Sequence, residues 1–533
     1  MVNKDVFYIL EEYLDNMAKV KSVSERPDGE DITFKPFFTS LAMKSMQSTG
    51  VDVKNGGVTA RSNRMDPYYF GRMEMRMGDS KKGGGSACNT FALPKDINRK
   101  SSRIPLWLNA NSTFWGCVHD FNERYDDTLG SDDVREKYVY FSDEEPVIFT
   151  GREKEMTVDL KELENKLLDI SRGLMKPDLV DVDLSFDAVK EGRYLVNSEG
   201  TRIFTSYMRY QLMMSINALD NKGLIIPHTH VWYGTDMGNI PCYDDIMARG
   251  ETLTSELLDI IKAPLEKNDT LPVILDGENT GVVFHEVIGH SLEAHRMQED
   301  EWGDVTTLFK DKIGEKVAPE FITLYDDPTR QELDGHYQFD EDGVRSQKVM
   351  LVENCVLKNY LHSRESAGYF KTRSNGHARA YGSHTPTPRM SNLFVESNNR
   401  VSFDELVESL RKECVDQKKP YGLLMEGTNG GLTLPEECFF NTFPSNVFRV
   451  YANGKTERVR GAYIVGTPLQ VLNNFIQTSD RYSTFSGNCG AESGWIPSVE
   501  IAPDALVKSL EINRIPMSSY YKMPKPVLPK PDY

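Results

Sequence analysis

The sequence lacks several features that would place it in a specialised class of protein. Its 533 residues contain no run near the roughly 20 apolar residues of a membrane span, no tandem repeat and no long low-complexity tract. Basic residues are outnumbered by acidic ones, and the net charge of −18 argues against nucleic acid or an anionic membrane as the main partner. Hydrophobic residues (39%) and charged residues (27%) occur in ordinary proportions. We therefore expect a soluble globular protein with more than one domain.

Cysteine is scarce as well, and its seven copies form no CxxC pair. An odd number of scattered cysteines favours a reducing compartment over a disulfide framework. Met1–Ser22 is dotted with Asp, Glu and Lys, which fits an amphipathic helix better than the apolar core of a signal peptide. For a chain from which no leader has been trimmed, these features predict a cytoplasmic location.

The stretch with the clearest chemical meaning is Gly281–Gln298, which contains His285-Glu286-x-x-x-His290. Two neutral imidazoles can bind a zinc ion, and an adjacent glutamate can take a proton from metal-bound water. Leu271–Asp276 predicts a short buried strand before the motif, and the apolar spacing after it predicts a helix. The sequence thus places a candidate metal site where a strand leads into a helix.

The spacing of the two histidines is unusual for a helix. His-Glu-x-x-His pairs are i,i+4 and share one face, whereas His285 and His290 are i,i+5 and would lie about 140° apart on a regular helix. The two imidazoles can converge only if the helix widens into a π-bulge or is distorted at its end. Gly289 is the residue most able to allow this distortion. We therefore predict an irregular metal-binding helix.

The motif alone leaves the third metal ligand open. Cys489 lies in the Gly/Ser-rich stretch Ser483–Gly494, which predicts a loop with room for close approach, and a thiolate is a strong zinc ligand. Taken alone, a single cysteine is more often an inert core residue. His295 and Glu293 are alternatives near the motif. Four later histidines are further candidates, each more typical of a surface or hydrogen-bonding residue: His336, His362, His377 and His384.

Two other residue pairs are weaker metal candidates. His228 and His230 are i,i+2 on a predicted strand and would point to one side of it. Cys117 and His119 alternate with Trp115, and because no second pair lies nearby, packing is the favoured interpretation.

The periodicity divides the chain at the polar linker Glu266–Thr270. Residues 1–265 alternate helical and strand-like patterns, and residues 266–533 are β-rich after the motif. The clearest expected elements are helices at Val6–Val20, Asp159–Leu174, Asp244–Lys262, Ser402–Lys412 and Thr467–Thr478, and a hairpin at Val447–Val465 around Asn453-Gly454. These patterns predict an α+β fold.

The motif and later blocks resemble the TldD/PmbA family of metallopeptidases, in particular its TldD-like branch. The family motif HE-x-x-x-H-x-L-E is matched by His285, Glu286, His290, Leu292 and Glu293. Four further blocks occur in the family's order: Asp326–Gly343 running on to Leu351–Asn354, Pro386–Asn392, Gly427–Gly431 and Gly487–Gly490. The similarity covers about residues 270–510, is weaker over Glu155–Leu265, and is faint in the first 150 residues, where Asp79–Ser86 and Trp107–Asp127 do not align.

The resemblance implies a Zn²⁺ site of His285, His290 and Cys489, with Glu286 as general base. It implies an N-terminal α/β domain, placed at residues 1–265, that serves as a substrate and dimer scaffold. It also implies a C-terminal zinc metallopeptidase domain at residues 266–533, with a curved antiparallel sheet and the metal-binding helix. Family members form homodimers or TldD–PmbA heterodimers and cleave unfolded or short peptides. Since the PmbA-like partners lack the His-Glu motif, this chain resembles the catalytic type.

Candidate substrate contacts come from two of these blocks. His377, Arg379 and Arg389 are candidate donors to the oxyanion of the tetrahedral intermediate. Gly430 and Gly431 could offer backbone groups to an extended peptide, with an ordinary turn as the alternative. Two other functions stay open: a cysteine peptidase that uses Cys489 with a histidine, and a non-catalytic partner subunit.

Overall fold

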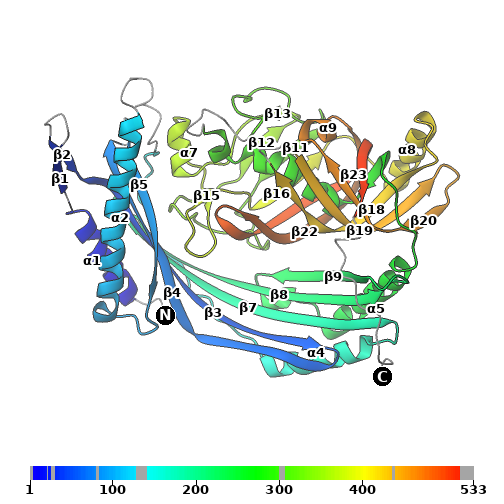
Figure 1. Cartoon of the computed structure of the whole chain (residues 1–533), viewed down its shortest axis with the longest axis horizontal. Helices are drawn as coiled ribbons and strands as arrows, with labels where there is room; N and C mark the ends of the chain where they lie inside the picture. Colours follow the sequence, from blue (N-terminus) through cyan, green and yellow to red (C-terminus); the bar gives the residue numbers. More distant parts are fainter. Residues whose placement is uncertain are drawn as a thin grey trace.

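Two large β-sheets organise the chain (Figure 1). The computed structural model describes residues 4–20, 22–25, 31–79, 83–127, 141–298, 307–434 and 439–515. Helices pack along both sheets, and most strand pairs are antiparallel. The α+β class expected from the sequence is confirmed.

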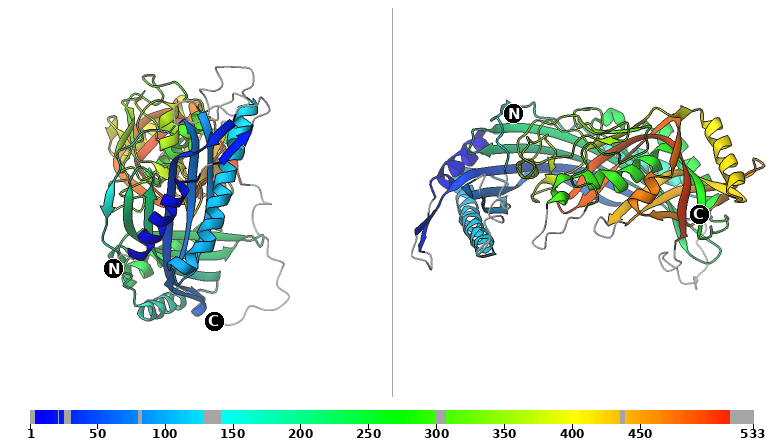
Figure 2. Two further views of the ribbon diagram at one scale, coloured as in Figure 1. Left: turned by 90° about the vertical axis from the view of Figure 1, so that its left-hand side faces the viewer. Right: turned by 90° about the horizontal axis from the view of Figure 1, so that it is seen from above.

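The first sheet is built from long strands of the first half of the chain. Its order is β5-β4-β3-β7-β8, with β6 and β9 both beside β8. Only the β6–β8 pair is parallel among the described pairs of this sheet. The long strands curve along the molecule (Figures 1 and 2). The strands are β3 (Pro36–Lys54), β4 (Gly57–Asp79), β5 (Gly83–Leu93), β6 (Ile148–Thr150), β7 (Leu179–Asn197), β8 (Arg202–Leu219) and β9 (Ile225–Gly234). A separate hairpin pairs β1 (Ser22–Glu25) with β2 (Asp31–Phe34).

Helices cover the first sheet at two places. Near one end, α4 (Leu160–Leu174) and α5 (Tyr243–Ile260) bury their apolar sides in one core cluster with β7 and β8. At the other end, α1 (Lys4–Met17) and α2 (Arg99–Asp127) pack with β3, β4 and β5 (Figure 1). The predicted helices at Val6–Val20, Asp159–Leu174 and Asp244–Lys262 are therefore confirmed.

Trp115, Cys117 and His119 all belong to one helix. These residues lie in helix α2, where the buried Cys117 and the exposed Trp115 and His119 lie on different faces. The thiol of Cys117 donates a hydrogen bond to the carbonyl of Gly85 at 2.9 Å. The alternation seen in the sequence therefore reflects a helix with one face in the core, and the packing interpretation of Cys117 is confirmed.

The second sheet carries the metal-site motif. Its order is β10-β18-β19-β21-β23-β16-β11-β12-β13, and β22 pairs with β23 and β17. Strand β10, predicted from Leu271–Asp276, lies between β18 and β23. The predicted hairpin at Asn453-Gly454 is formed by β19 and β20. The strands are β10 (Asp269–Leu275), β11 (Ile322–Asp326), β12 (Val349–Glu353), β13 (Val356–Leu357), β16 (Asn392–Ser397), β17 (Arg400–Val401), β18 (Tyr421–Leu434), β19 (Phe439–Tyr451), β20 (Thr456–Val459), β21 (Ala462–Gly466), β22 (Phe475–Ala491) and β23 (Gly494–Arg514).

Shorter elements complete this part. The helices are α6 (Gly277–Phe284), α7 (Arg364–Tyr369), α8 (Phe403–Asp416) and α9 (Pro468–Leu472), and β14 (Ala378–Arg379) pairs with β15 (Thr387–Pro388). The predicted helix at Ser402–Lys412 is confirmed. The prediction of a helix at Thr467–Thr478 is wrong beyond Leu472, because the chain enters β22 at Phe475 and pairs with β23.

Buried ion pairs join the two sheets. Glu341, from the segment that follows β11, lies 2.7 Å from Lys44, 2.8 Å from Arg72 and 3.5 Å from Arg193, all on strands of the first sheet. Burial alone would raise the pKa of Glu341, but Lys44, Arg193 and Arg72 hold it well below its usual value. One carboxylate therefore contacts cations from three strands.

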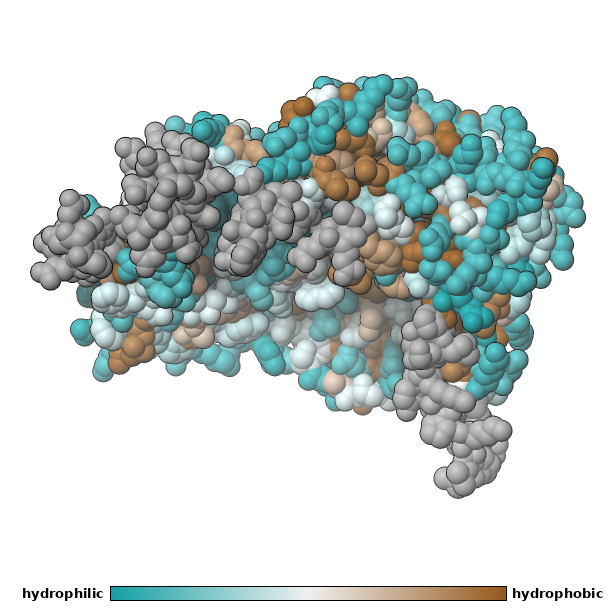
Figure 3. Space-filling view, turned by 45° about the horizontal axis from the view of Figure 1, so that its top comes forward, coloured by the Kyte–Doolittle hydropathy of each residue, from teal (hydrophilic) through white to brown (hydrophobic). Residues whose placement is uncertain are grey.

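The surface is mainly hydrophilic in the view of Figure 3, with apolar side chains in patches. Among the described residues, no helix is both long and apolar enough to cross a lipid bilayer. The chain passes from the first sheet to the second between α5 and β10. A domain boundary at residues 265–266 remains our proposal for this passage.

Replacing Glu341 with Ala should destabilise the fold by about 3–5 kcal/mol, because it leaves buried cations without their carboxylate. The variant Glu341→Gln keeps the shape and some hydrogen bonds and should lose less. Urea unfolding of both variants against wild type measures this difference.

The same contact predicts a pH dependence. The native pKa of Glu341 lies below that of the unfolded chain, so its contribution is complete above about pH 4 and is lost as the pH falls further. The Gln variant should therefore lose less stability than wild type between pH 5 and pH 3, estimated as roughly the window of glutamate titration. Equal acid sensitivity of the two proteins would contradict this assignment.

Candidate metal centre

The His-Glu motif occupies a widened turn at the end of α6. Asp276 caps the helix, since its carboxylate accepts a hydrogen bond from the backbone of Asn279 at 2.9 Å. After Phe284 the chain forms a π-turn at residues 285–289, in which the backbone N–H of His290 donates to the carbonyl of His285. The local widening predicted from the i,i+5 spacing is therefore confirmed.

Gly289 permits this turn for a different reason from the one expected. Its φ of −57° and ψ of −57° are ordinary for a helix, so no special backbone freedom is used. A side-chain carbon at Gly289 would instead lie 2.1 Å from the sulfur of Met390. Gly289 is needed because Met390 packs directly against the turn.

Both imidazoles point at the sulfur of Cys489. Nε2 of His285 lies 3.1 Å from Sγ, and Nε2 of His290 lies 3.3 Å from it. The three side chains are buried. In the described part of the chain, they form the one group of three or more His, Cys, Asp or Glu residues close enough to hold a common ion.

Cys489 lies on a strand, which corrects the predicted loop. It belongs to β22, opposite Ile496 of β23 in a tight hairpin. The small residues that suggested a loop serve packing instead, since a side-chain carbon at Gly490 would lie 2.9 Å from the ring of Trp495. The hairpin holds the sulfur at a fixed position, which a flexible loop would not.

Carboxylates hold the far nitrogen of each imidazole. Nδ1 of His285 lies 2.7 Å from Glu500, and Nδ1 of His290 lies 3.1 Å from Glu293. Such contacts fix the tautomer and leave Nε2 as the metal-binding atom. Glu293, considered above as a third ligand, thus contacts and orients the ligand His290. Glu500 was missed, because it lies 215 residues from His285 at no recognisable spacing.

Arg389 contacts the cysteine rather than a position for substrate. Its guanidinium is fully buried and donates to Sγ of Cys489 at 3.0 Å and to the Cys489 carbonyl at 2.9 Å. Burial alone would raise the pKa of the Cys489 thiol, but His290, His285 and Arg389 hold it well below its usual value. The sulfur is therefore a thiolate, the form that binds metal.

Glu286 lies beside the three ligands with one oxygen unused. The side chain is buried, and Oε2 has no hydrogen-bond partner among the described residues. Gly431 of β18 makes room for it, because a side-chain carbon there would lie 2.8 Å from Cγ of Glu286 and 2.9 Å from Oε1. Burial raises the pKa of Glu286, which suits a carboxylate that accepts a proton.

The donor set fits zinc. Two imidazoles and one thiolate are ligands that zinc prefers, and three protein ligands leave one position for water or substrate. Beside this donor set, Oε2 of Glu286 has no hydrogen-bond partner in the described part of the chain and would be free to accept a proton from bound water.

The remaining candidate residues have other partners. His377 is fully buried between Asp326, at 3.1 Å, and Asn375, at 3.0 Å, so it is not placed to contact a substrate in this structure. Arg379 donates to the carbonyl of Met390 and lies 5.0 Å from the ring centre of Tyr337.

The other histidines considered as ligands are accounted for by hydrogen bonds and packing. Their partners are Glu256 for His228, Trp232 for His230, Glu492 for His295, the Pro328 carbonyl for His336, Ser366 for His362 and the Tyr381 carbonyl for His384. None of them belongs to a three-residue ligand group in the described part of the chain.

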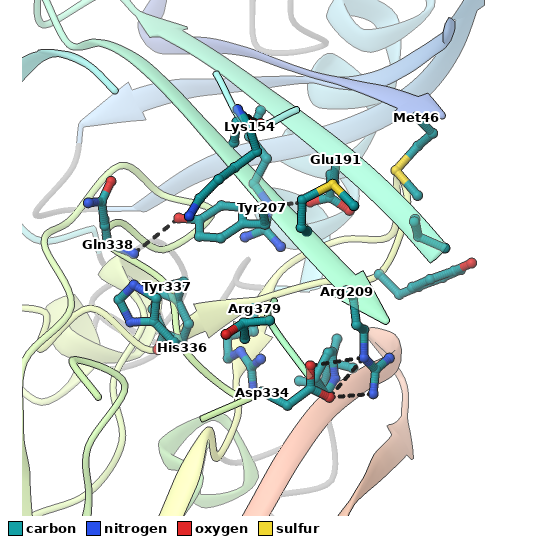
Figure 4. A pocket seen from close by; sticks show the side chains of 18 of the residues that line it. Met46, Lys154, Glu191, Tyr207, Arg209, Asp334, His336, Tyr337, Gln338 and Arg379 are labelled. Carbon is teal, nitrogen blue, oxygen red and sulfur yellow. Dashed lines mark hydrogen bonds and ion pairs between the residues drawn. The ribbon is translucent and has the colours of Figure 1, made fainter. Parts of the chain in front are cut away.

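A cavity of about 990 Å³ lies between the two sheets (Figure 4). Tyr207 and Arg209 of β8 line it together with Asp334 and Arg379. Arg209 is paired with Asp334, and it also donates to the side chain of Asn488 at 2.8 Å. Glu286 and the three ligands do not line the cavity. The cavity adjoins the site at Asn488, which lies in its wall and precedes Cys489 in the chain.

Comparison with known proteins gives the family. Residues 268–514 match the family model of the PmbA/TldA metallopeptidase C-terminal domain. A metalloprotease of Methanocaldococcus jannaschii is 27% identical over 384 residues, which cover 70% of this chain and 80% of the relative. Residues 268–514 thus form a domain of the PmbA/TldD family.

Two further likenesses agree with this membership. A zinc metalloprotease TldD homologue of Saccharolobus solfataricus is 25% identical over 304 residues, which cover 56% of this chain and 64% of the relative. The crystal structure of TldE from Thermococcus kodakarensis superposes with a TM-score of 0.61 at 17% identity, covering 90% of this chain and 97% of that one, and so shares the fold. The relatives from Methanocaldococcus jannaschii and Saccharolobus solfataricus are both named as metalloproteases.

Replacing Gly431 with Ala should lower peptidase activity by about 10–100-fold while zinc is retained, because the new methyl group displaces the Glu286 carboxylate. Gly314→Ala is the matched control. It has open space around the new carbon but a φ of +90°, so it should cost about 1 kcal/mol of stability and leave activity near wild type. Equal activity of the two variants would contradict the contact.

Replacing Glu500 with Gln should weaken zinc binding by about 10-fold, because His285 loses its charged partner. Competition with a chromophoric chelator measures the affinity. Glu396→Gln is the control, since Glu396 accepts a hydrogen bond from Tyr325 and contacts none of the ligands. A Glu500→Gln protein with unchanged zinc affinity would show that this carboxylate does not support the site.

Proposed function

We propose that this chain is the catalytic, TldD-like type of the family, a zinc-dependent peptidase that hydrolyses peptide bonds in unfolded or short peptides. The observation that supports this proposal is the convergence of His285, His290 and Cys489 beside the unpaired carboxylate of Glu286. A non-catalytic partner subunit would have no use for this complete constellation.

Zinc held by His285, His290 and Cys489 would supply a Lewis acid that activates water and polarises the scissile carbonyl. Glu286 accepts the proton of the attacking water and passes it to the leaving amine. Burial raises the pKa of Glu286, so its carboxylate accepts a proton more readily than an exposed glutamate would. Arg389 keeps the sulfur of Cys489 ionised and in place.

In this proposal, the substrate peptide binds along the unpaired edge of strand β18. Strand β19 pairs with β18 from Tyr421 to Leu434, whereas β10 pairs only with residues 423–425. In the described part of the chain, no strand pairs with the remaining edge of β18. An extended peptide added there would run past Gly430 and Gly431, and so past Glu286. The adjoining cavity, with Arg379 in its wall, would receive the rest of the peptide.

A cysteine peptidase is the second candidate, because the Cys489 thiolate contacts two imidazoles. Three groups already hold that sulfur, namely His285, His290 and Arg389, and this favours a ligand over a nucleophile. The six described cysteines are free thiols, which supports a reducing, cytoplasmic setting. As in the family, we propose that the chain pairs with a second subunit, either its own copy or a PmbA-like one.

Metal content and peptide cleavage test the proposal together. Wild type should carry about one zinc per chain. Cys489→Ser should lose most of this zinc, while Glu286→Gln should keep it and cleave an unfolded substrate such as casein at least about 100-fold more slowly. Mass spectrometry of the metal and of the digest gives both readouts.

Chelators and alkylating agents separate the two chemistries. A zinc peptidase loses activity with a chelator and regains it with zinc. A cysteine peptidase ignores the chelator and is blocked by iodoacetamide. Full activity of zinc-loaded Glu286→Gln would overturn the role of the base, and a well-folded wild type that binds no zinc would overturn the metal site.

A further inference from the structure

Arg379 is a buried cation that no carboxylate of the described chain pairs with. The residue is 8% exposed and lies in the wall of the cavity between the two sheets (Figure 4). Its Nη1 donates to the carbonyl of Met390, and its guanidinium carbon lies 5.0 Å from the ring centre of Tyr337. Nε and Nη2 have no hydrogen-bond partner among the described residues. Two nitrogen donors of a permanently charged group are therefore left for a ligand.

The other buried arginines of the described chain show what is missing here. A charge away from water is unfavourable unless an opposite charge is close. Each of the other five pairs with a carboxylate: Arg72 with Glu341, Arg76 with Glu74, Arg364 with Glu199, Arg389 with Glu293, and Arg460 with Asp220. Burial alone would lower the pKa of Arg72, but Glu341 and other charges raise it. At Arg379 the effect of burial prevails, and the pKa is lowered.

Two carboxylates interact with this guanidinium at longer range, but other groups hold both of them. Asp326 is fully buried and contacts His377 at 3.1 Å and the backbone N–H of Ser391 at 2.8 Å. Asp334 accepts a hydrogen bond from Arg209 at 2.8 Å, as Figure 4 shows. The missing counter-charge is therefore expected to come from a molecule in the cavity.

The position of Arg379 connects the cavity to the metal centre. Met390, whose carbonyl accepts its hydrogen bond, packs with its sulfur against Gly289 in the π-turn between the two histidine ligands. The residue before it, Arg389, donates to Sγ of Cys489 at 3.0 Å. A ligand held at Arg379 is thus bound beside the turn that carries the metal ligands.

We propose that Arg379 binds a carboxylate of the substrate peptide, with Nε and Nη2 donating to its two oxygens. The inference rests on the peptidase function proposed above and names the chemical group that the cavity selects. An arginine fork and a carboxylate match in shape and charge, and such paired hydrogen bonds are among the strong ones in proteins. Every peptide has this group at its C-terminus, and aspartate and glutamate side chains carry it as well.

The cavity suits a peptide carboxylate better than a phosphate. One unpaired cation balances one negative charge, whereas a phosphate group carries about two. The excess would lie in a wall that already contains Asp187, Glu191 and Asp334. The cavity volume of about 990 Å³ is also large enough for several residues of a peptide.

Peptide binding to zinc-loaded Glu286→Gln tests the proposal without requiring cleavage. The probes are an acetylated alanine peptide with a free C-terminal carboxylate, the same peptide as an amide, and amides with one glutamate at each position in turn. At least one acidic form should bind about 10–100-fold more tightly than the neutral amide by calorimetry. Preference for the free acid assigns the C-terminal carboxylate, and preference for a glutamate amide assigns a side chain.

Replacing Arg379 in this background shows whether it causes the preference. With Arg379→Met the acidic and neutral peptides should bind equally, whereas Arg379→Lys should keep part of the difference, because it retains the charge without the planar fork. In the enzyme with Glu286 intact, the ratio of kcat/KM for the acidic and neutral peptides should fall toward one with Arg379→Met. A loss of structure would lower both values and leave their ratio unchanged.

Stability separates ligand binding from a structural role. Arg379→Met removes a buried charge that has no counter-charge, whereas Arg460→Met leaves the buried carboxylate of Asp220 without its partner. The midpoint of urea unfolding should therefore fall less for Arg379→Met than for Arg460→Met. Zinc content verifies that the metal centre of each variant is intact.

Three results would overturn the proposal. They are equal binding of acidic and neutral peptides, a preference for acidic peptides that persists in Arg379→Met, and a loss of stability in Arg379→Met as large as in Arg460→Met. Failure of the peptidase function is distinguishable from these, because it appears as absent cleavage of every peptide while the binding preference still decides the role of Arg379.

Discussion

One sulfur atom shared by two imidazoles is the constraint on which the catalytic half of this protein depends. His285 and His290 meet at Cys489 only because the helix widens between them and a hairpin from the far end of the chain reaches the same point. Neither the widened helix nor the hairpin would bring the three ligands together by itself. A regular helix would turn the two histidines apart, and a cysteine on a loose loop would have no fixed distance to either.

Burial strengthens the electrostatic contacts of this site, but it also makes every unpaired charge there unfavourable. A thiolate and several carboxylates away from water are strongly unfavourable unless each has a partner. Glu500, Glu293 and Arg389 supply those partners, and all of them are fully or almost fully buried. The carboxylate of Glu286 keeps one oxygen free. Oε2 of Glu286, the atom proposed to exchange a proton, thus stays without a hydrogen bond in the described structure beside otherwise paired ligands, and the site lies within a sheet of twelve strands.

Sequence reasoning succeeded where the information was local. The i,i+5 spacing of His285 and His290 predicted a π-bulge or a distorted helix end, because a regular helix would keep the two side chains apart. It failed where packing between distant segments decides. Nothing near Glu500 marks it as a partner of His285, and small residues around Cys489 resemble a loop although they pack a hairpin. Arg389 was noticed for its block, yet only the fold shows that it binds the sulfur.

The metal centre and helix α2 lie in separate parts of the structure. The metal centre is a buried set of charges whose members must all be present, and the matching segment, residues 268–514, carries all of them. Helix α2 lies outside that segment, and its outer face consists of tryptophans and charges that the chain's own core does not use. Changes in α2 leave the ligands untouched, since the two share no contact in the described structure. The fold thus keeps the metal centre and helix α2 in separate cores.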